Sequence, residues 1–245
     1  MIEPGWIPAS WPTPPQIHAG VTTRLGGVSH SPYTSLNLAL HVGDESAAVM
    51  ENRIRLRQFL HLPTEPIWLN QVHGVQVCTD VQAGTQADAS VSQQPGQVCV
   101  VLTADCLPVL FCDRAGTVVA AAHAGWRGLA AGVIPETMKH MQVDPTDIIA
   151  WLGPAIGPRA FEVGDDVRTS FLKLGEDYAR VFSARSPGKW LMDLYAAARL
   201  QLAGLGITQV YGGEYCTYED DKRFYSYRRE RETGRMASLT WIQPA

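Results

Sequence analysis

The stretch from Thr103 to Gly128, TADCLPVLFCDRAGTVVAAAHAGWRG, constrains the fold most strongly. Two apolar runs, 107–111 and 117–122, flank the sequence Asp-Arg-Ala-Gly, a pattern typical of a β-hairpin. Cys106 directly precedes the first run, and His123 directly follows the second. In a hairpin the start of one strand lies beside the end of the other. The thiol and the imidazole are therefore predicted to lie within reach of each other.

The remaining sequence predicts a mixed α/β (α+β) architecture in which strands predominate. An extended arm is expected over 1–16 and a polar loop over 82–97. Further strands are expected over 17–23, 67–70, 75–79, 98–102, 147–152, 210–211, 224–228 and 237–242. Helices are expected over 45–60, with Ser46 as N-cap, and over 129–141, 164–174 and 190–205.

Pro135 lies inside the second of these helices and predicts a kink or break near Ile134. The sequence contains no repeat, low-complexity tract or linker that divides it. We therefore expect a single domain that spans residues 1–245.

The composition narrows the classes of partner. With 24 acidic and 20 basic residues the net charge is −4, so the balance of charge does not indicate a nucleic-acid partner. No apolar run approaches the roughly 20 residues of a membrane-spanning helix, and no secretory signal is evident. The 5 cysteines include no Cys-x-x-Cys pair. We expect reduced thiols in a cytoplasmic protein that is a monomer or a weak homodimer.

His73, Cys106 and His123 form the first candidate site. Two imidazoles and a thiolate suit Zn²⁺, and three protein ligands leave a fourth position open, as in catalytic zinc sites. The long separations match no short metal-binding motif, so a buried cysteine with two hydrogen-bonded histidines is the alternative. The same atoms also predict a nucleophilic Cys106–His123 dyad, with Asp105 or another polar group orienting the imidazole.

Two arginine-containing stretches are further candidates. Gly125-Trp-Arg127-Gly ends a strand and opens a helix, which predicts either an anion site or a tight turn with a solvated arginine. The tract 223–235 contains five arginines among aromatic residues, and its acids favour a strand and hairpin with exposed charges over a nucleic-acid surface. Arg24, with Asn37 and His41 downstream, is a weaker candidate.

Seven stretches resemble a known family. They are Thr-Arg-Leu-Gly-Gly-Val-Ser at 23–29, Ser-Leu-Asn-Leu at 35–38, Gln-Val-His-Gly at 71–74, Thr-Ala-Asp-Cys-Leu-Pro at 103–108, His-Ala-Gly-Trp-Arg-Gly at 123–128, Trp-Leu-Gly-Pro-Ala-Ile-Gly-Pro at 151–158 and Arg-Glu-Thr-Gly-Arg-Met-Ala at 231–237. Together and in this order they resemble the YfiH-type bacterial proteins, also called laccase-domain or multicopper polyphenol oxidase-like proteins. The resemblance covers nearly the whole chain.

The resemblance implies a four-layer α/β/β/α domain, related in fold to the catalytic domain of the cytotoxic necrotizing factors. It implies a Zn²⁺ site on His73, Cys106 and His123. It also implies phosphorolysis of adenosine, inosine, guanosine and methylthioadenosine, and deamination of adenosine. A second activity implied for such proteins is peptidoglycan editing, which removes a wrong amino acid from a UDP-muramoyl precursor.

Our leading hypothesis is a zinc-dependent purine nucleoside enzyme acting on small molecules. Its expected catalytic residues are Cys106, His123, Arg127 and Asp105, the last as a candidate proton shuttle. Expected residues for substrate and phosphate are Arg24, Asn37, His41, Gln71 and Arg127.

Three alternatives remain open: a Cys106/His123 amidase acting on the cell-wall precursor, a copper-binding polyphenol oxidase-like protein, and a metal-binding protein without turnover. The chain has 7 histidines and no His-x-His pair, too few for the blue site and three-copper cluster of a multicopper oxidase. Cu²⁺ stays possible at a thiolate site, because it binds such ligands more tightly than Zn²⁺.

Overall fold

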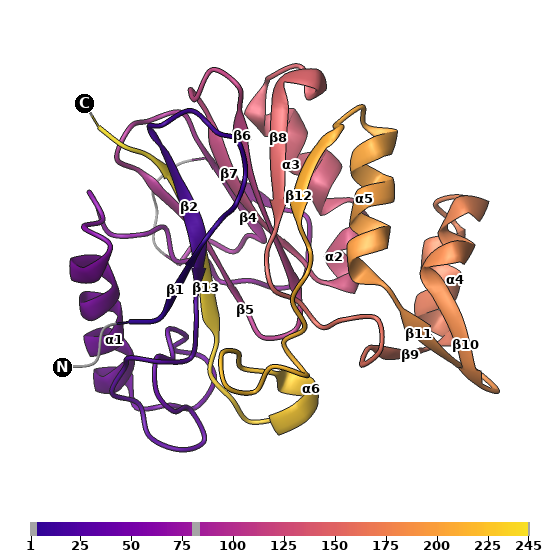
Figure 1. Cartoon of the computed structure of the whole chain (residues 1–245), viewed down its shortest axis with the longest axis horizontal. Helices are drawn as coiled ribbons and strands as arrows, with labels where there is room; N and C mark the ends of the chain where they lie inside the picture. The colour runs from indigo at the N-terminus through magenta and orange to yellow at the C-terminus, as the bar shows by residue number, and fades with distance from the viewer. Residues whose placement is uncertain (1–3, 80–83, 245) are drawn as a thin grey trace.

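Two β-sheets packed face to face form the centre of the structure, a computed structural model that describes residues 4–79 and 84–244 (Figure 1). The four-stranded sheet has the order β1 (Trp6–Pro8), β2 (Ile17–Thr22), β13 (Met236–Ile242) and β5 (Val98–Thr103). The six-stranded sheet has the order β12 (Gln209–Gly212), β8 (Ile148–Leu152), β6 (Leu107–Asp113), β7 (Val119–Ala124), β4 (Ala89–Ser92) and β3 (Val77–Cys78).

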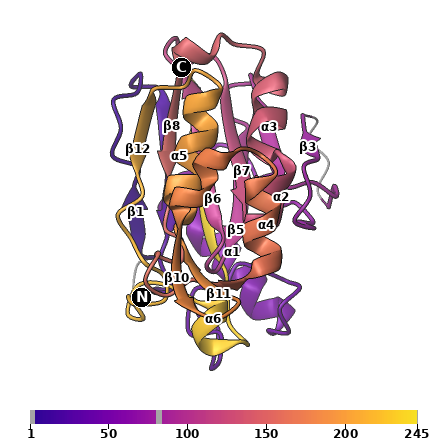
Figure 2. The same cartoon turned by 90° about the vertical axis from the view of Figure 1, so that its right-hand side faces the viewer.

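Helices cover the outer face of each sheet. On the four-stranded sheet lies α1 (Ser46–Phe59). On the six-stranded sheet lie α2 (Trp126–Ala131), α3 (Val133–Met141) and α5 (Leu194–Gly204), which Figure 2 shows in front of the strands. Beyond them are α4 (Asp165–Leu172) and a small sheet of β10 (Phe182–Ser186), β11 (Lys189–Met192) and β9 (Glu162–Gly164).

The apolar pattern of the central strands explains these layers. In β5, Cys99 and Val101 pack between the two sheets, whereas Val98, Val100 and Leu102 pack under α1. Because successive side chains of a strand point to opposite faces, a continuous apolar strand has two buried faces. The result is a mixed α/β domain with four layers in the order α/β/β/α, which confirms the expected fold class.

The predicted hairpin is confirmed, since β6 and β7 pair antiparallel with Leu107 opposite Ala124 and Pro108 opposite His123. All 5 cysteines lie in the described part of the chain, and none of them forms a disulfide bond. Cys99 and Cys112 are core residues, and burial raises the pKa of each thiol to about 12. In the described residues no helix is long and apolar enough to cross a membrane.

The expected helix over 129–141 is interrupted, but not at Pro135. It divides at Gly132, whose φ of 96° lies in the left-handed region and ends α2. Pro135 lies in the first turn of α3, where a backbone N–H has no partner within the helix. The N–H that proline lacks therefore removes no hydrogen bond from the helix.

Several other sequence predictions were wrong in detail. The expected helix 190–205 begins only at Leu194, because 189–192 pairs with two neighbouring strands as β11. Residues 224–228 form no strand: a short helix, α6 (Tyr227–Glu230), begins there. The polar loop 82–97 contains the buried strand β4, and 67–70 makes only isolated bridges. Glu45 rather than Ser46 occupies the N-cap of α1, without a side-chain cap.

The break at Gly132 yields a stability prediction. A Cβ at Gly132 meets only Pro135 Cγ, at 3.8 Å, so Gly132→Ala is disfavoured by backbone conformation and not by a clash. We expect Gly132→Ala to lower the free energy of unfolding by about 1–2 kcal/mol. Pro135→Ala should lower it by less than about 1 kcal/mol, through the unfolded chain alone. Urea unfolding measures both, and a larger effect of Pro135→Ala would contradict this assignment.

Candidate metal and active site

Asp88, directly before β4, organises the candidate site. Its buried carboxylate accepts hydrogen bonds from the backbone N–H groups of Val72 (3.2 Å), His73 (2.9 Å) and Gly74 (2.6 Å). The same carboxylate lies 2.8 Å from Nδ1 of His123. An ionised carboxylate only accepts hydrogen bonds, so Nδ1 of His123 is the donor and Nε2 is left for a metal or a thiolate.

The structure brings His73, Cys106 and His123 together. Their ligand atoms all lie within 4.8 Å of one another, and Cys106 Sγ is 4.0 Å from His73 Nε2. Ligands that surround one tetrahedral Zn²⁺ lie about 3.5 Å apart, so small side-chain movements would complete such a site. The donor set and the carboxylate behind His123 both fit a metal ion with an open fourth position.

Strained backbone presents two of the three residues of this cluster. His73 has a φ of 61° and Asp105, directly before Cys106, has a φ of 90°. Such values are disfavoured for residues other than glycine. Asp88 holds the first turn, and the second is held by the Asp105 carboxylate, which accepts from Thr217 Oγ1 (2.7 Å) and the Arg228 N–H (2.6 Å).

The charges of Cys106 and His123 depend on each other. Burial raises the pKa of Cys106, but the neighbouring His123 and His73 outweigh this effect and lower the pKa to about 6. Burial lowers the pKa of His123, but Cys106 and then Asp88 raise it to about 9. In metal-free protein near pH 7 the pair is therefore a thiolate and an imidazolium.

Gly125 has a steric role beside this pair. A Cβ at Gly125 would lie 2.7 Å from Cys106 Sγ and 3.5 Å from His73 Cδ2. The glycine after β7 is thus required by the close approach of the thiol. This contact gives a structural reason for the start of the Gly-Trp-Arg-Gly sequence, which had suggested an anion site.

The cluster lines a cavity of about 460 Å³ where the ends of β5, β6 and β7 meet. Of the expected site residues, His41, Gln71 and Arg127 also line it. Gln71 is tied to the Leu102 backbone by two hydrogen bonds, of 2.9 and 2.7 Å. Arg127 is exposed, and its guanidinium lies 4.5 Å from the Trp126 ring centre.

Three expected site residues lie behind the cavity wall instead. Arg24 pairs with Glu230 at 2.8 Å and donates to the backbone oxygens of residues 34 and 221. Asn37 is fully buried and bonds to the chain at 39, 44 and 235. Asp105 holds the wall segment described above. Their contacts are those of residues that support the wall, and their direct roles toward substrate stay predictions.

Sequence reasoning did not identify Asp88, Trp126, Tyr227 or Arg235 as site residues, although the last three line the cavity. The only signal for Asp88 was an acid directly before a short run that forms a buried strand. The prediction of a strand and hairpin with exposed charges at 223–235 was also wrong, because hydrogen bonds to backbone oxygens hold some of its arginines against the protein. Arg229, for example, is half-buried because it donates to the backbone oxygens of residues 217, 218 and 224.

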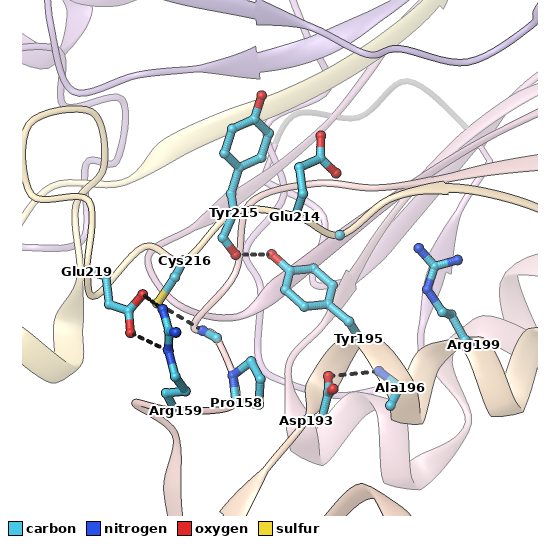
Figure 3. A pocket seen from close by; sticks show the side chains of 12 residues that line it. Pro158, Arg159, Asp193, Tyr195, Ala196, Arg199, Glu214, Tyr215, Cys216 and Glu219 are labelled. Carbon is cyan, nitrogen blue, oxygen red and sulfur yellow. Dashed lines mark hydrogen bonds and ion pairs between the residues drawn. The ribbon is translucent and has the colours of Figure 1, made fainter.

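A second cavity, of about 480 Å³, lies between α5 and the segment after β12 (Figure 3). Here Cys216 Sγ accepts a hydrogen bond from the Gly157 N–H at 3.2 Å, and Arg159 pairs with Glu219 at 2.8 Å. Tyr195 and Asp193, which also line this cavity, form hydrogen bonds with backbone groups. Among the described residues the metal-sized cluster of His73, Cys106 and His123 lies at the first cavity alone.

Fold and site together define an α/β/β/α protein with a His–Cys–His cluster at the strand ends that could hold a metal ion. The chain belongs to the family described as multi-copper polyphenol oxidoreductase laccase, whose family model matches residues 18–243. It is 52% identical over 240 residues to a purine nucleoside phosphorylase of Pseudomonas aeruginosa, covering 97% of this chain and 98% of that protein. It is also 52% identical over 239 residues to purine nucleoside phosphorylase YfiH of Escherichia coli, covering 96% of this chain and 98% of that protein.

Solved structures agree with this assignment. A Neisseria meningitidis protein of family DUF152 superposes with a TM-score of 0.95 at 50% identity, covering 98% of this chain and 100% of that one. YlmD from Geobacillus stearothermophilus gives a TM-score of 0.91 at 33% identity, covering 98% and 97%. These comparisons confirm the family and the fold that the sequence motifs indicated.

Asp88 yields a prediction for metal binding. Asp88→Asn keeps the shape but removes the charge behind His123, so we expect zinc affinity to fall roughly 10–100-fold. Asp113→Asn is the matched control, because that buried carboxylate accepts three hydrogen bonds at the other end of the same hairpin. Competition with a chromophoric chelator measures the affinity. Equal losses in both variants would show that Asp88 acts only on stability.

The reactivity of Cys106 yields a prediction for pH dependence in metal-free protein. The thiolate is the reactive form, so alkylation speeds up as the pH rises through the pKa and then levels off. We expect the half-maximal rate near pH 6, the pKa of about 6 that His123 and His73 produce. His123→Ala should move this midpoint upward. A rate that still rises steeply above about pH 8, as for an ordinary thiol of pKa about 8.5, would contradict the ion pair.

Proposed function

We propose that this protein is a zinc-dependent purine nucleoside phosphorylase whose reaction takes place in the cavity beside His73, Cys106 and His123. The observation that carries the proposal is that cavity, which combines a three-ligand metal cluster with arginine side chains on its wall. Two relatives that match nearly the full chain carry the name purine nucleoside phosphorylase. We extend their named activity to this chain as a proposal.

The cluster supports zinc as the resident ion. A thiolate and two imidazoles are typical zinc ligands, and Asp88 fixes the orientation of His123 as second-sphere carboxylates do in zinc sites. Zinc bound there would act as a Lewis acid at the open position. Cu²⁺ could use the same ligands, but the described residues offer one such cluster, whereas a multicopper oxidase requires several copper sites.

Phosphorolysis assigns tasks to the residues of the cavity wall. An oxygen of phosphate forms a bond to C1′ of the nucleoside, the C1′–N9 bond breaks, and the purine leaves with a proton. Arg127 would neutralise the attacking phosphate. Burial, and then the charges of Arg235 and Arg53, lower the pKa of His41, which is therefore neutral at pH 7 and suited to hydrogen bonding with a nucleoside.

The wall favours phosphorolysis over deamination as the principal reaction. Zinc deaminases use an acidic side chain as proton shuttle. In the described part of the chain no carboxylate lines this cavity, and Asp105 already accepts two hydrogen bonds elsewhere. Adenosine deamination is carried here as a secondary activity, beside inosine, guanosine, adenosine and methylthioadenosine as phosphorolysis substrates.

One observation favours a second candidate function. Cys106, His123 and Asp88 follow the order of nucleophile, base and orienting carboxylate in thiol hydrolases. A Cys106/His123 amidase could remove an amino acid from a UDP-muramoyl precursor, with peptide-bond hydrolysis through a thioester. This chemistry uses a free thiolate and therefore competes with metal binding at the same sulfur.

The two functions predict opposite behaviour. Zinc-loaded protein given inosine and phosphate should release hypoxanthine and ribose 1-phosphate in equal amounts, and none without phosphate. Cys106→Ala should lower this rate by roughly 100-fold or more, because the metal cluster loses its anionic ligand. Chromatography of the products measures both. Amide hydrolysis by metal-free protein, abolished when Cys106 is alkylated, would instead establish the amidase.

A further inference from the structure

Arg235 is a half-buried cation on the wall of the metal-site cavity, two residues after Thr233 and just before β13. One nitrogen of its guanidinium, Nη1, donates to the backbone oxygens of Thr233 (2.8 Å) and Gly234 (3.0 Å). The guanidinium carbon lies 5.9 Å from the Tyr227 ring centre. These contacts fix the plane of the group without neutralising its charge.

The rest of the Arg235 guanidinium is unpaired. Within residues 4–79 and 84–244, no carboxylate lies at ion-pair distance from Arg235, and its Nε and Nη2 have no hydrogen-bond acceptor. Burial lowers the pKa of Arg235, consistent with a charge that has lost part of its hydration. A half-buried charge is unfavourable unless it is paired, so this edge of the side chain needs an anionic partner.

The arginines of the second cavity and of the wall behind the metal-site cavity are satisfied by protein groups, in contrast to the half-buried Arg235. Arg159, in the second cavity, forms a two-pronged ion pair with Glu219, and its neighbour Arg199 donates to the backbone oxygens of residues 210 and 212. Arg24 is paired with Glu230. Of these four side chains, only Arg235 presents two unpaired donors beside the metal cluster.

Asn37 holds this arginine in place. Its Oδ1 accepts from the backbone N–H of Arg235 at 3.0 Å and from that of Ala39 at 3.0 Å, while its Nδ2 donates to Asp44 at 2.9 Å. The buried amide thereby ties the segment that carries Arg235 to the 37–44 loop that carries His41. The position of the cation is thus set by the fold and not by a ligand.

The charge around the cavity indicates which ligand the unpaired edge would take. Arg127, which follows β7 of the six-stranded sheet, and Arg235, which precedes β13 of the four-stranded sheet, both line the cavity. No carboxylate among the described residues balances them there. A compact oxyanion with several acceptor oxygens suits two guanidinium groups, whereas a single carboxylate occupies only one.

We infer that Arg235 is the principal phosphate-binding residue of the site and holds the anion by its Nε and Nη2 donors, with Arg127 as the second cation. This inference rests on the proposed phosphorolysis. It assigns the anion subsite mainly to the 233–236 segment and not to the turn that begins α2. Arg235 touches the phosphate, and Asn37 is its positioning residue.

The test is a set of arginine variants of the zinc-loaded protein, assayed by inosine phosphorolysis. Arg235→Gln should raise the KM for phosphate roughly tenfold or more while the KM for inosine changes less than about twofold. Arg235→Lys should give a smaller rise, since it keeps the charge but loses the planar fork. Arg127→Gln should also give a smaller rise than Arg235→Gln. Arg114→Gln, an exposed arginine outside the cavity, is the matched control and should change neither KM.

A binding measurement separates this inference from the proposed function. Inorganic phosphate should raise the Tm of the wild-type protein and of Arg114→Gln, but not that of Arg235→Gln, with acetate at equal ionic strength giving no rise. Phosphate stabilisation through Arg235 without phosphorolysis would overturn the proposed function but keep the anion site. An unchanged KM for phosphate in active Arg235→Gln would overturn the inference alone, and an equal Tm rise with acetate would overturn the assignment of phosphate.

Discussion

The site depends first on the buried carboxylate of Asp88. It accepts three backbone hydrogen bonds from the turn 72–74 and one hydrogen bond from His123, so one side chain joins a loop to the end of a hairpin. Burial raises the pKa of Asp88, but the His123 hydrogen bond and the Gly74 N–H outweigh it and bring the pKa below its ordinary value. The carboxylate therefore stays ionised, and it fixes both the position of His73 and the tautomer of His123.

The layers of the fold explain why the cavity lies beside this carboxylate. β5 and β13 belong to one sheet and β6 and β7 to the other, and all four contribute an end, or a residue next to an end, to the cavity wall. Buried polar residues behind the wall, chiefly Asn37 and Asp105, secure the loops there by hydrogen bonds. The His–Cys–His cluster, the buried residues that support the wall and the arginines of the cavity thus come from segments far apart in the chain. This is expected of a site built on a rigid scaffold.

The sequence predicted the parts of this arrangement that depend on local pattern. Antiparallel pairing of two apolar runs was enough to place Cys106 near His123. The ligand chemistry of the residue types added His73, which the family motifs then supported. The sequence could not predict Asp88 as a site residue. The role of that carboxylate depends on its hydrogen bonds to the turn 72–74 and to the His123 imidazole, which only the folded chain brings beside it. For the same reason Asn37 and Asp105 were expected to face substrate, although their side chains form hydrogen bonds with other segments of the chain. Arg235 was not identified, because it lies in the charged tract 223–235. The sequence does not reveal which charges of that tract are buried and which are exposed.

The measurement that tests the account most directly is a zinc titration of chelated protein with inosine phosphorolysis as the readout. The account predicts a rate that rises in proportion to added zinc and levels off at about one zinc per chain, as expected for one set of three protein ligands. His73→Ala should show no comparable rise. Full activity in metal-free protein, or a wild-type rate independent of zinc, would contradict the claim that His73, Cys106 and His123 form a catalytic metal site.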